Sequence, residues 1–304
     1  MKNLLDHDLI VQRRRRALKQ QAGNGKDGAK RGGDFLTPII AGELAERLML
    51  VERHFDTAIE FHPPGSGIAD SLMATAKIGE LTAIAGHGEL LGKRKGVVNT
   101  SLDAVPVDPG STNLIVAPLC LHLSNDTPGT LIQIRRALAP DGLFLAAVPG
   151  AGTLNELNQS LLLAEQETTG GATPRIVPFA DVKTHGALLQ RAGFTLPVAD
   201  VETLNIRYAR MHDLMRDLRA MGMTNPLSNR SRKPVSRRFF ERVEEIYHNR
   251  FADADGRIRA TFVLVYLSGW APHESQQKPL KPGSAKTRLA DALRTVAKDT
   301  KSSV

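Results

Sequence analysis

Residues 55–67 read FDTAIEFHPPGSG, and this stretch decides the fold class. An apolar run closes on Glu60, a turn of proline and glycine follows, and residues 68–76 have the spacing of a helix. A strand that enters a turn and then a helix is the opening of a nucleotide-binding α/β domain, in which backbone N–H groups at the turn face the ligand. We therefore expect residues 55–61 to form a parallel strand of a central sheet.

Strands and helices continue to alternate along the chain. Apolar runs that are continuous rather than alternating predict parallel strands buried on both faces. Asp126, the pair of Thr153 and Glu156, and Asp181 each stand where a side chain can cap the start of a helix. The order predicts an α/β fold with a doubly wound, mostly parallel, seven-stranded sheet and an antiparallel terminal strand. The predicted strands are residues 55–61, 81–84, a short strand from 96, and residues 113–119, 143–148, 200–208 and 257–269.

Composition divides the chain into three parts. They are a basic N-terminal arm and linker (1–33), an α/β domain (34–273) with a helical insertion at about 209–256, and a basic C-terminal tail (274–304). The arm is expected to contain a short amphipathic helix over residues 4–19, and the tail a last helix over residues 284–295. A hydrophobic content of 41% over 304 residues is enough to bury the core of such a domain.

The net charge of +8 is unevenly distributed. Basic residues outnumber acidic ones by 9 to 4 in residues 1–34, by 13 to 7 in residues 205–260 and by 7 to 3 in residues 274–304. A slightly acidic body with basic segments favours an anionic partner, such as an acidic protein, a lipid surface or nucleic acid. Solvated helix faces are the simpler explanation of any single cluster. Few aromatic side chains near residues 230–233 could stack on bases, so nucleic acid is the least favoured partner.

The sequence also bears on location. A single cysteine, Cys120, allows no intramolecular disulfide and fits a reducing compartment. The sequence contains no run of about 18 apolar residues, so no membrane span is predicted. Residues 1–8 lack the apolar core of a signal peptide. We expect a protein of the bacterial cytoplasm, or of the mitochondrial matrix if the source is eukaryotic, with at most peripheral contact to a membrane.

Several stretches together resemble one family. They are residues 124–129 (SNDTPG), 133–144 (QIRRALAPDGLF), 178–182 (PFADV), 214–222 (LMRDLRAMG) and the tail over 269–285. With them the chain resembles, over about 34–293, the class I methyltransferase-like family that includes the mitochondrial complex I assembly factor. The resemblance implies a Rossmann-like methyltransferase fold, S-adenosylmethionine as the ligand and a protein client in respiratory complex I assembly. In the mitochondrial member that role is arginine hydroxylation of the client subunit.

The cofactor loop departs from the family pattern D/E-x-G-x-G-x-G. The acid is kept as Glu60, but His62, Pro64 and Ser66 stand at the glycine positions. Proline donates no N–H, and Cβ atoms now stand where the chain approaches the cofactor closely. The second strand ends in residues 85–87 (AGH) rather than in the acid that binds the ribose hydroxyls.

These departures predict that S-adenosylmethionine binding is weak or lost. Asp103 stands at the position that contacts adenine in the family, so it could still contact the adenine of the cofactor. The residues expected to line any cofactor at the carboxyl ends of the strands are Glu60, His62, Gly65, Gly67, Asp103, Pro118 and His122.

No catalytic residue and no metal ligand can be named from the sequence. Cys120 follows a buried strand without an evident activating partner, which favours a core role. His54 with Asp56, and His87 with Glu89, have the H-x-D/E spacing of iron sites, but such pairs arise easily by chance. His54 also precedes its strand, on the side away from a Rossmann-type site.

Three functions therefore remain open. They are a modifying enzyme (methyltransferase or hydroxylase), a non-catalytic assembly factor that kept the fold and the client surface, and a nucleic-acid binder. For the first two we expect the client to be recognised by the helical insertion and the tail rather than by the sheet, because the basic side chains of the insertion lie outside the sheet. Those side chains are Arg216, Arg219, Arg230, Arg232, Lys233, Arg237 and Arg238.

Overall fold

The computed structural model describes residues 3–22, 33–65, 67–91, 94–171 and 173–277. The chain consists of two compact units, Met1–Pro272 and His273–Val304, and the fold and the site lie in the first. The predicted linker falls largely, and the predicted C-terminal helix entirely, outside the described residues. The three-part division of the chain remains a prediction.

A seven-stranded sheet forms the centre of the first unit, in the order β3-β2-β1-β4-β5-β7-β6. Neighbours from β3 to β5 pair in parallel, whereas β7 is antiparallel to both β5 and β6. This confirms the predicted fold class and its antiparallel terminal strand. The strands are β1 (Phe55–Phe61), β2 (Ile78–Ile84), β3 (Gly96–Val97), β4 (Thr112–Pro118), β5 (Leu138–Pro149), β6 (Thr195–Tyr208) and β7 (Ile258–Trp270).

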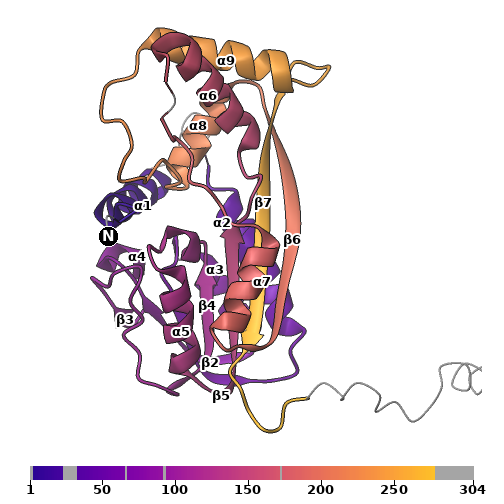
Figure 1. Cartoon of the computed structure of the whole chain (residues 1–304). Helices are drawn as coiled ribbons and strands as arrows, with labels where there is room; N and C mark the ends of the chain where they lie inside the picture. The colour runs from indigo at the N-terminus through magenta and orange to yellow at the C-terminus, as the bar shows by residue number, and fades with distance from the viewer. Residues whose placement is uncertain (1–2, 23–32, 66, 92–93, 172, 278–304) are drawn as a thin grey trace, which may run out of the picture. The chain divides into compact units, whose positions relative to one another are not determined.

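Helices cover both faces of this sheet (Figure 1). Alternate side chains of β4 point to opposite faces, so that Leu114 and Val116 join one core cluster while Ile115 and Ala117 join the other. The first cluster contains α2 (Leu36–Met49), α3 (Gly67–Ala74), α6 (Asn155–Thr169), α8 (Met211–Ala220) and α9 (Arg237–Phe251). The second contains α5 (Thr127–Ala137) and α7 (Val182–Arg191).

Two of the expected helix caps form, and one does not. Asp126 accepts a hydrogen bond from the Gly129 N–H at 3.0 Å, and Asp181 accepts one from Thr184 at 2.7 Å. The capping box predicted at Thr153 and Glu156 is wrong, because no side chain caps α6.

Both residues of that expected capping box form hydrogen bonds with strand β7 instead. The Thr153 hydroxyl donates to the Val263 carbonyl oxygen at 3.0 Å. The Glu156 carboxylate accepts a hydrogen bond from the Thr261 hydroxyl. A tertiary partner has therefore displaced the local one.

The helical insertion stands on an extension of the sheet. β7 pairs with β5 only over residues 264–270 but with β6 along its whole length. The β6–β7 ribbon therefore continues beyond the other strands, and α8 and α9 connect its far ends (Figure 1). α9 packs on α6.

Candidate functional site

The acid that closes β1 is engaged in a buried ion pair. Glu60 is 0% exposed, and its carboxylate contacts the guanidinium of Arg94, which follows α4 (Gly88–Leu91). Arg94 also donates to the Leu90 carbonyl at 2.9 Å and to the Gly65 carbonyl at 3.4 Å. Burial lowers the pKa of Arg94. This arginine thus ties the turn after β1 to the segment after β2, and sequence reasoning did not foresee it.

His62 fills the turn itself. Its φ of 48° lies in the left-handed region, consistent with a position where the family has glycine. The backbone N–H donates to Ile84 at 2.7 Å, and the ring Nε2 lies 3.1 Å from the Ser101 carbonyl. Burial, and then the nearby Arg14 cation, lower the pKa of His62 to about 3. The ring is therefore buried in its neutral form at physiological pH.

Helix α1 (His7–Ala22) crosses the same edge of the sheet. Arg14, only 6% exposed, donates to the His62 carbonyl at 2.9 Å and to the Leu119 carbonyl at 2.6 Å. A Cβ built on Gly86 would lie 2.8 Å from the Val11 side chain, so α1 packs directly on the end of β2.

Further contacts hold α1 at both flanks of this edge. The Leu18 side chain lies against Gly65, and Arg15 pairs with Glu89 at 3.0 Å. The helix foreseen in the basic arm therefore covers the predicted cofactor edge. A periodicity argument identifies such a helix but gives no information on the surface that it covers.

The remaining predicted cofactor residues are distributed around this edge. The carboxylate of Asp103 accepts hydrogen bonds from the Ser124 hydroxyl and the Asn125 N–H, both at 2.7 Å, and so fixes the loop after β4. Gly67 begins α3, and Pro118 ends β4. Helix α1 thus contacts His62 and Gly65, Glu60 is paired with Arg94, and Asp103 accepts hydrogen bonds from Ser124 and Asn125.

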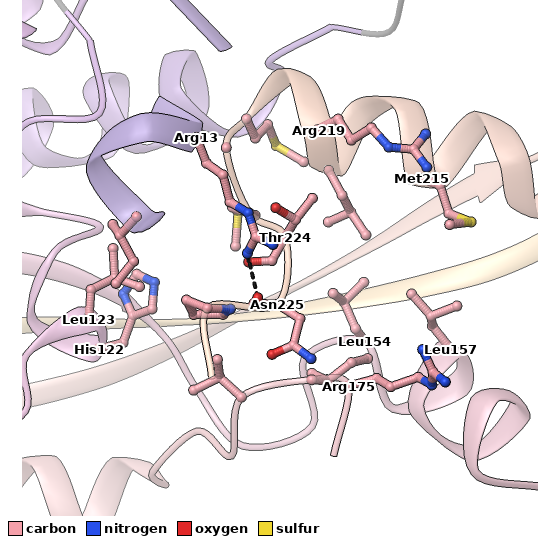
Figure 2. Close-up of a pocket in the computed structure, with 18 of the residues that line it drawn as sticks. Arg13, His122, Leu123, Leu154, Leu157, Arg175, Met215, Arg219, Thr224 and Asn225 are labelled. Atoms are coloured by element: carbon pink, nitrogen blue, oxygen red, sulfur yellow. Dashed lines mark hydrogen bonds between the residues drawn. The ribbon is translucent and has the colours of Figure 1, made fainter. Parts of the chain in front are cut away.

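His122 lies at the rim of a cavity of about 240 Å³ that adjoins the predicted cofactor edge (Figure 2). The cavity is bounded by α1, α6, α8 and the segments 175–179 and 222–226, and it touches the edge through Pro64 and Leu119. Burial, followed by Arg14 and His185, lowers the pKa of His122 to about 3. Among the described residues its Nδ1 atom has no hydrogen-bond partner.

The charged groups on the cavity wall are all cationic. Arg13, Arg14, Arg175 and Arg219 line it, and no aspartate or glutamate does so among the residues that the structure describes. The other walls are mostly leucine, isoleucine, methionine and phenylalanine side chains. The arrangement can hold an anion or the apolar part of a ligand, but it offers no counter-charge to a cation.

The other candidate groups are engaged in core packing or in ion pairs. Cys120 is buried and burial raises the pKa of its thiol to about 12, which agrees with a core role. His54 lies 3.4 Å from Asp56 at the start of β1, and Glu89 is engaged by α1. Within the described residues no group of three or more His, Cys, Asp and Glu side chains is placed to hold a metal ion.

The strand order and the turn after β1 define a protein with the class I, Rossmann-like methyltransferase fold. The crystal structure of a candidate methyltransferase from Bacillus halodurans matches with a TM-score of 0.52 at 12% identity. The match covers 76% of this chain and 100% of that chain, which shows the shared fold. No family model matches the chain.

Sequence comparison identifies the narrower group. Mitochondrial arginine-hydroxylase NDUFAF5 from Danio rerio is 34% identical over 284 residues, which are 91% of this chain and 87% of that protein. The protein of the same name from Dictyostelium discoideum is 42% identical over 199 residues. That match covers 65% of this chain and 45% of the Dictyostelium protein, so this chain spans less than half of that relative. The chain belongs to the NDUFAF5 arginine-hydroxylase family, which confirms the resemblance found in the sequence.

Proposed function

We propose that the protein acts on a protein subunit of respiratory complex I during assembly of the complex. The observation that carries this proposal is the 34% identity to an arginine-hydroxylase of the NDUFAF5 family over 91% of the chain. We expect it to work in the cytoplasm of a bacterium or in the matrix of a mitochondrion. No helix among the described residues is long and apolar enough to cross a membrane.

We further infer that S-adenosylmethionine, the ligand implied by the fold, binds weakly or not at all. The residues at the expected site fit it poorly. Glu60 already has Arg94 as its partner. Leu18 of α1 lies against Gly65 of the loop, and Val11 lies against Gly86 after β2. A cofactor at this edge requires α1 to move, with loss of the two hydrogen bonds from Arg14. Each hydrogen bond from a charged group contributes about 1.5–3 kcal/mol.

A second candidate is an assembly factor without catalysis. The same occupied edge favours it, because a scaffold whose ligand edge is filled by its own helix can still present a client surface. In both cases we expect the basic residues of the helical insertion to recognise the client. Of these, Arg232, Lys233 and Arg238 are exposed, whereas Arg216 pairs with Asp213.

Arg230 departs from that expectation. Its side chain is 18% exposed and pairs with Asp6 at 3.1 Å, so it fastens the N-terminal segment to the insertion. The proposed client surface therefore does not include Arg230.

Mass spectrometry of complex I subunits from a deletion strain tests the proposal. For a modifying enzyme, one client peptide should lose the mass of one oxygen or one methylene, and the wild-type gene should restore it. For a non-catalytic factor, the peptide masses should be unchanged while assembled complex I decreases. Normal peptide masses together with normal levels of assembled complex I would contradict both forms of the proposal.

A further inference from the structure

The cavity beside the predicted cofactor edge contains a cation that lacks a counter-charge. Arg14 is buried, and its guanidinium bonds to two backbone carbonyl groups. No carboxylate among the described residues forms an ion pair with it. Buried charges in proteins are normally paired, because an uncompensated charge in a medium of low polarity is costly. The position of Arg14 on the cavity wall therefore indicates that an anion completes the site.

A second arginine lies one residue earlier on α1 and also lines the cavity. Arg13 donates to the carbonyl groups of Thr224, at 2.9 Å, and Asn225, and Figure 2 shows its side chain reaching toward this segment. These carbonyl bonds fix the position of the guanidinium. Asp6 acts on Arg13 electrostatically, but within the described residues it forms its ion pair with Arg230 rather than with Arg13. Arg175, by contrast, is already paired with Glu165 at 2.9 Å. Arg13 and Arg14 therefore form the pair of neighbouring anion-binding groups on α1, whereas Arg219, which also lines the cavity, is an exposed residue of α8.

Apart from Arg219, the walls formed by α6 and α8 are apolar. Leu157 and Leu161 of α6 and Met215 and Leu218 of α8 line these walls. The unbranched methionine adapts its shape to an apolar ligand. His122 adds a neutral ring whose buried Nδ1 has no partner in the described structure and could bond a ligand oxygen. A cavity with a cationic end and an apolar wall fits a ligand with one anionic and one apolar end.

We propose that this cavity binds a small amphipathic anion, with its carboxylate or phosphate head at Arg13 and Arg14 and its apolar body between α6 and α8. Cationic ligands do not fit this cavity. A client arginine side chain would bring a further positive charge to a wall without an acid, so a guanidinium is not expected to bind here. This site does not depend on S-adenosylmethionine and stands whether or not the protein is a catalyst.

Calorimetry on the full chain tests this inference with four probes of equal chain length and with inorganic phosphate as a fifth probe that lacks the apolar chain. Octanoate and octyl phosphate supply the two head groups, octanol removes the charge, and octylamine reverses it. We expect the two anions to bind, and the stronger of them to identify the head group. Octanol and octylamine should bind at least about tenfold more weakly, because they lose the charge-assisted hydrogen bonds to the arginines. Equal binding of octanol and octanoate, or equal binding of inorganic phosphate and octyl phosphate, would overturn the proposal.

Variants locate the binding within the cavity. Arg13→Gln should weaken octanoate binding about tenfold, and Arg16→Gln, an exposed arginine on the same helix, should leave it unchanged. Met215→Trp should block the apolar end without any change of charge. Arg14→Gln is added if it remains folded, but Arg13 and Met215 suffice. Unaltered octanoate affinity in both Arg13→Gln and Met215→Trp, or no octanoate binding by the wild type, would show that the cavity is not the site.

Discussion

Replacing Arg94 with methionine should destabilise the protein strongly, because it leaves Glu60 as an unpaired buried carboxylate. Glu60 is fully buried, and apart from its contact with Arg94 its two carboxylate oxygens have no partner among the described residues. Removing one member of a buried ion pair typically costs about 3–5 kcal/mol, since the remaining charge stays in a medium of low polarity. With a total stability of about 5–15 kcal/mol, that loss is a large fraction of the whole.

Urea denaturation followed by circular dichroism measures this cost. The midpoint should fall while the dependence of the unfolding free energy on urea, the m-value, stays constant. The double variant Glu60→Met/Arg94→Met should recover most of the loss, because replacing a whole buried pair by apolar side chains is often neutral. Arg242→Met serves as a matched control: it breaks exposed pairs with Glu167 and Glu245 and should cost no more than about 1 kcal/mol.

The stability of Arg94→Met relative to the control variant decides whether Glu60 depends on Arg94. If Arg94→Met costs no more than Arg242→Met, then water or another group satisfies Glu60, and the ion pair does not close the cofactor edge. In that case the acid would be available to a ligand, and the inference of weak S-adenosylmethionine binding would lose one of its supports. A double variant that is as unstable as Arg94→Met would show instead that packing, not charge, explains the loss.

Three further predictions follow from the same contacts. The pKa of His62 is about 3 in the folded protein, well below its ordinary value, so its contribution to stability is present above about pH 6.5 and is lost as the pH falls toward 3. Between pH 7.5 and pH 5 the free energy of unfolding should fall by about 2 kcal/mol because of His62. In urea titrations at the two pH values, His62→Gln should reduce this fall. An unchanged pH dependence of the unfolding free energy would show that the ring is not buried as a neutral group. Calorimetry with S-adenosylmethionine should give weaker binding than an intact methyltransferase measured alongside, and tight stoichiometric binding would show that α1 moves away readily. Arg232→Ser/Lys233→Ser should leave the melting temperature unchanged but weaken client capture at low salt, whereas Arg230→Ser should lower the melting temperature because it releases Asp6; normal capture by the double variant would place the client surface elsewhere.

The sheet could be predicted from the sequence because its signals are local. The run at residues 113–119 is continuous and apolar, and β4 occupies Thr112–Pro118. Asp126 and Asp181 cap their helices for an equally local reason, since donor and acceptor lie three residues apart. The capping box at Thr153 failed where β7, 110 residues further along the chain, supplied a competing partner.

The candidate site was only partly predictable, because its decisive contacts join distant parts of the chain. The sequence identifies Glu60 as the acid that closes β1, but nothing local indicates that Arg94 is its partner. The run of arginines at 13–16 has the composition of a solvated basic face, yet Arg14 is buried between two carbonyl groups. Amphipathic spacing shows that a helix has an apolar side and leaves open what covers it.

The N-terminal segment is fastened to residues that are synthesised more than 200 positions later. Leu5 forms a β-bridge with Leu227, the Asp6 N–H donates to Pro226 at 2.9 Å, and the Ser228 N–H donates to Leu4 at 2.9 Å. Contacts of such long sequence separation form late, because the intervening chain must first be ordered. Although α1 is synthesised before the insertion, it can dock only after the insertion has emerged and folded. On the growing chain the carboxyl edge of the sheet therefore stays uncovered until late in synthesis, and a ligand that binds this edge has its widest access before the protein is complete.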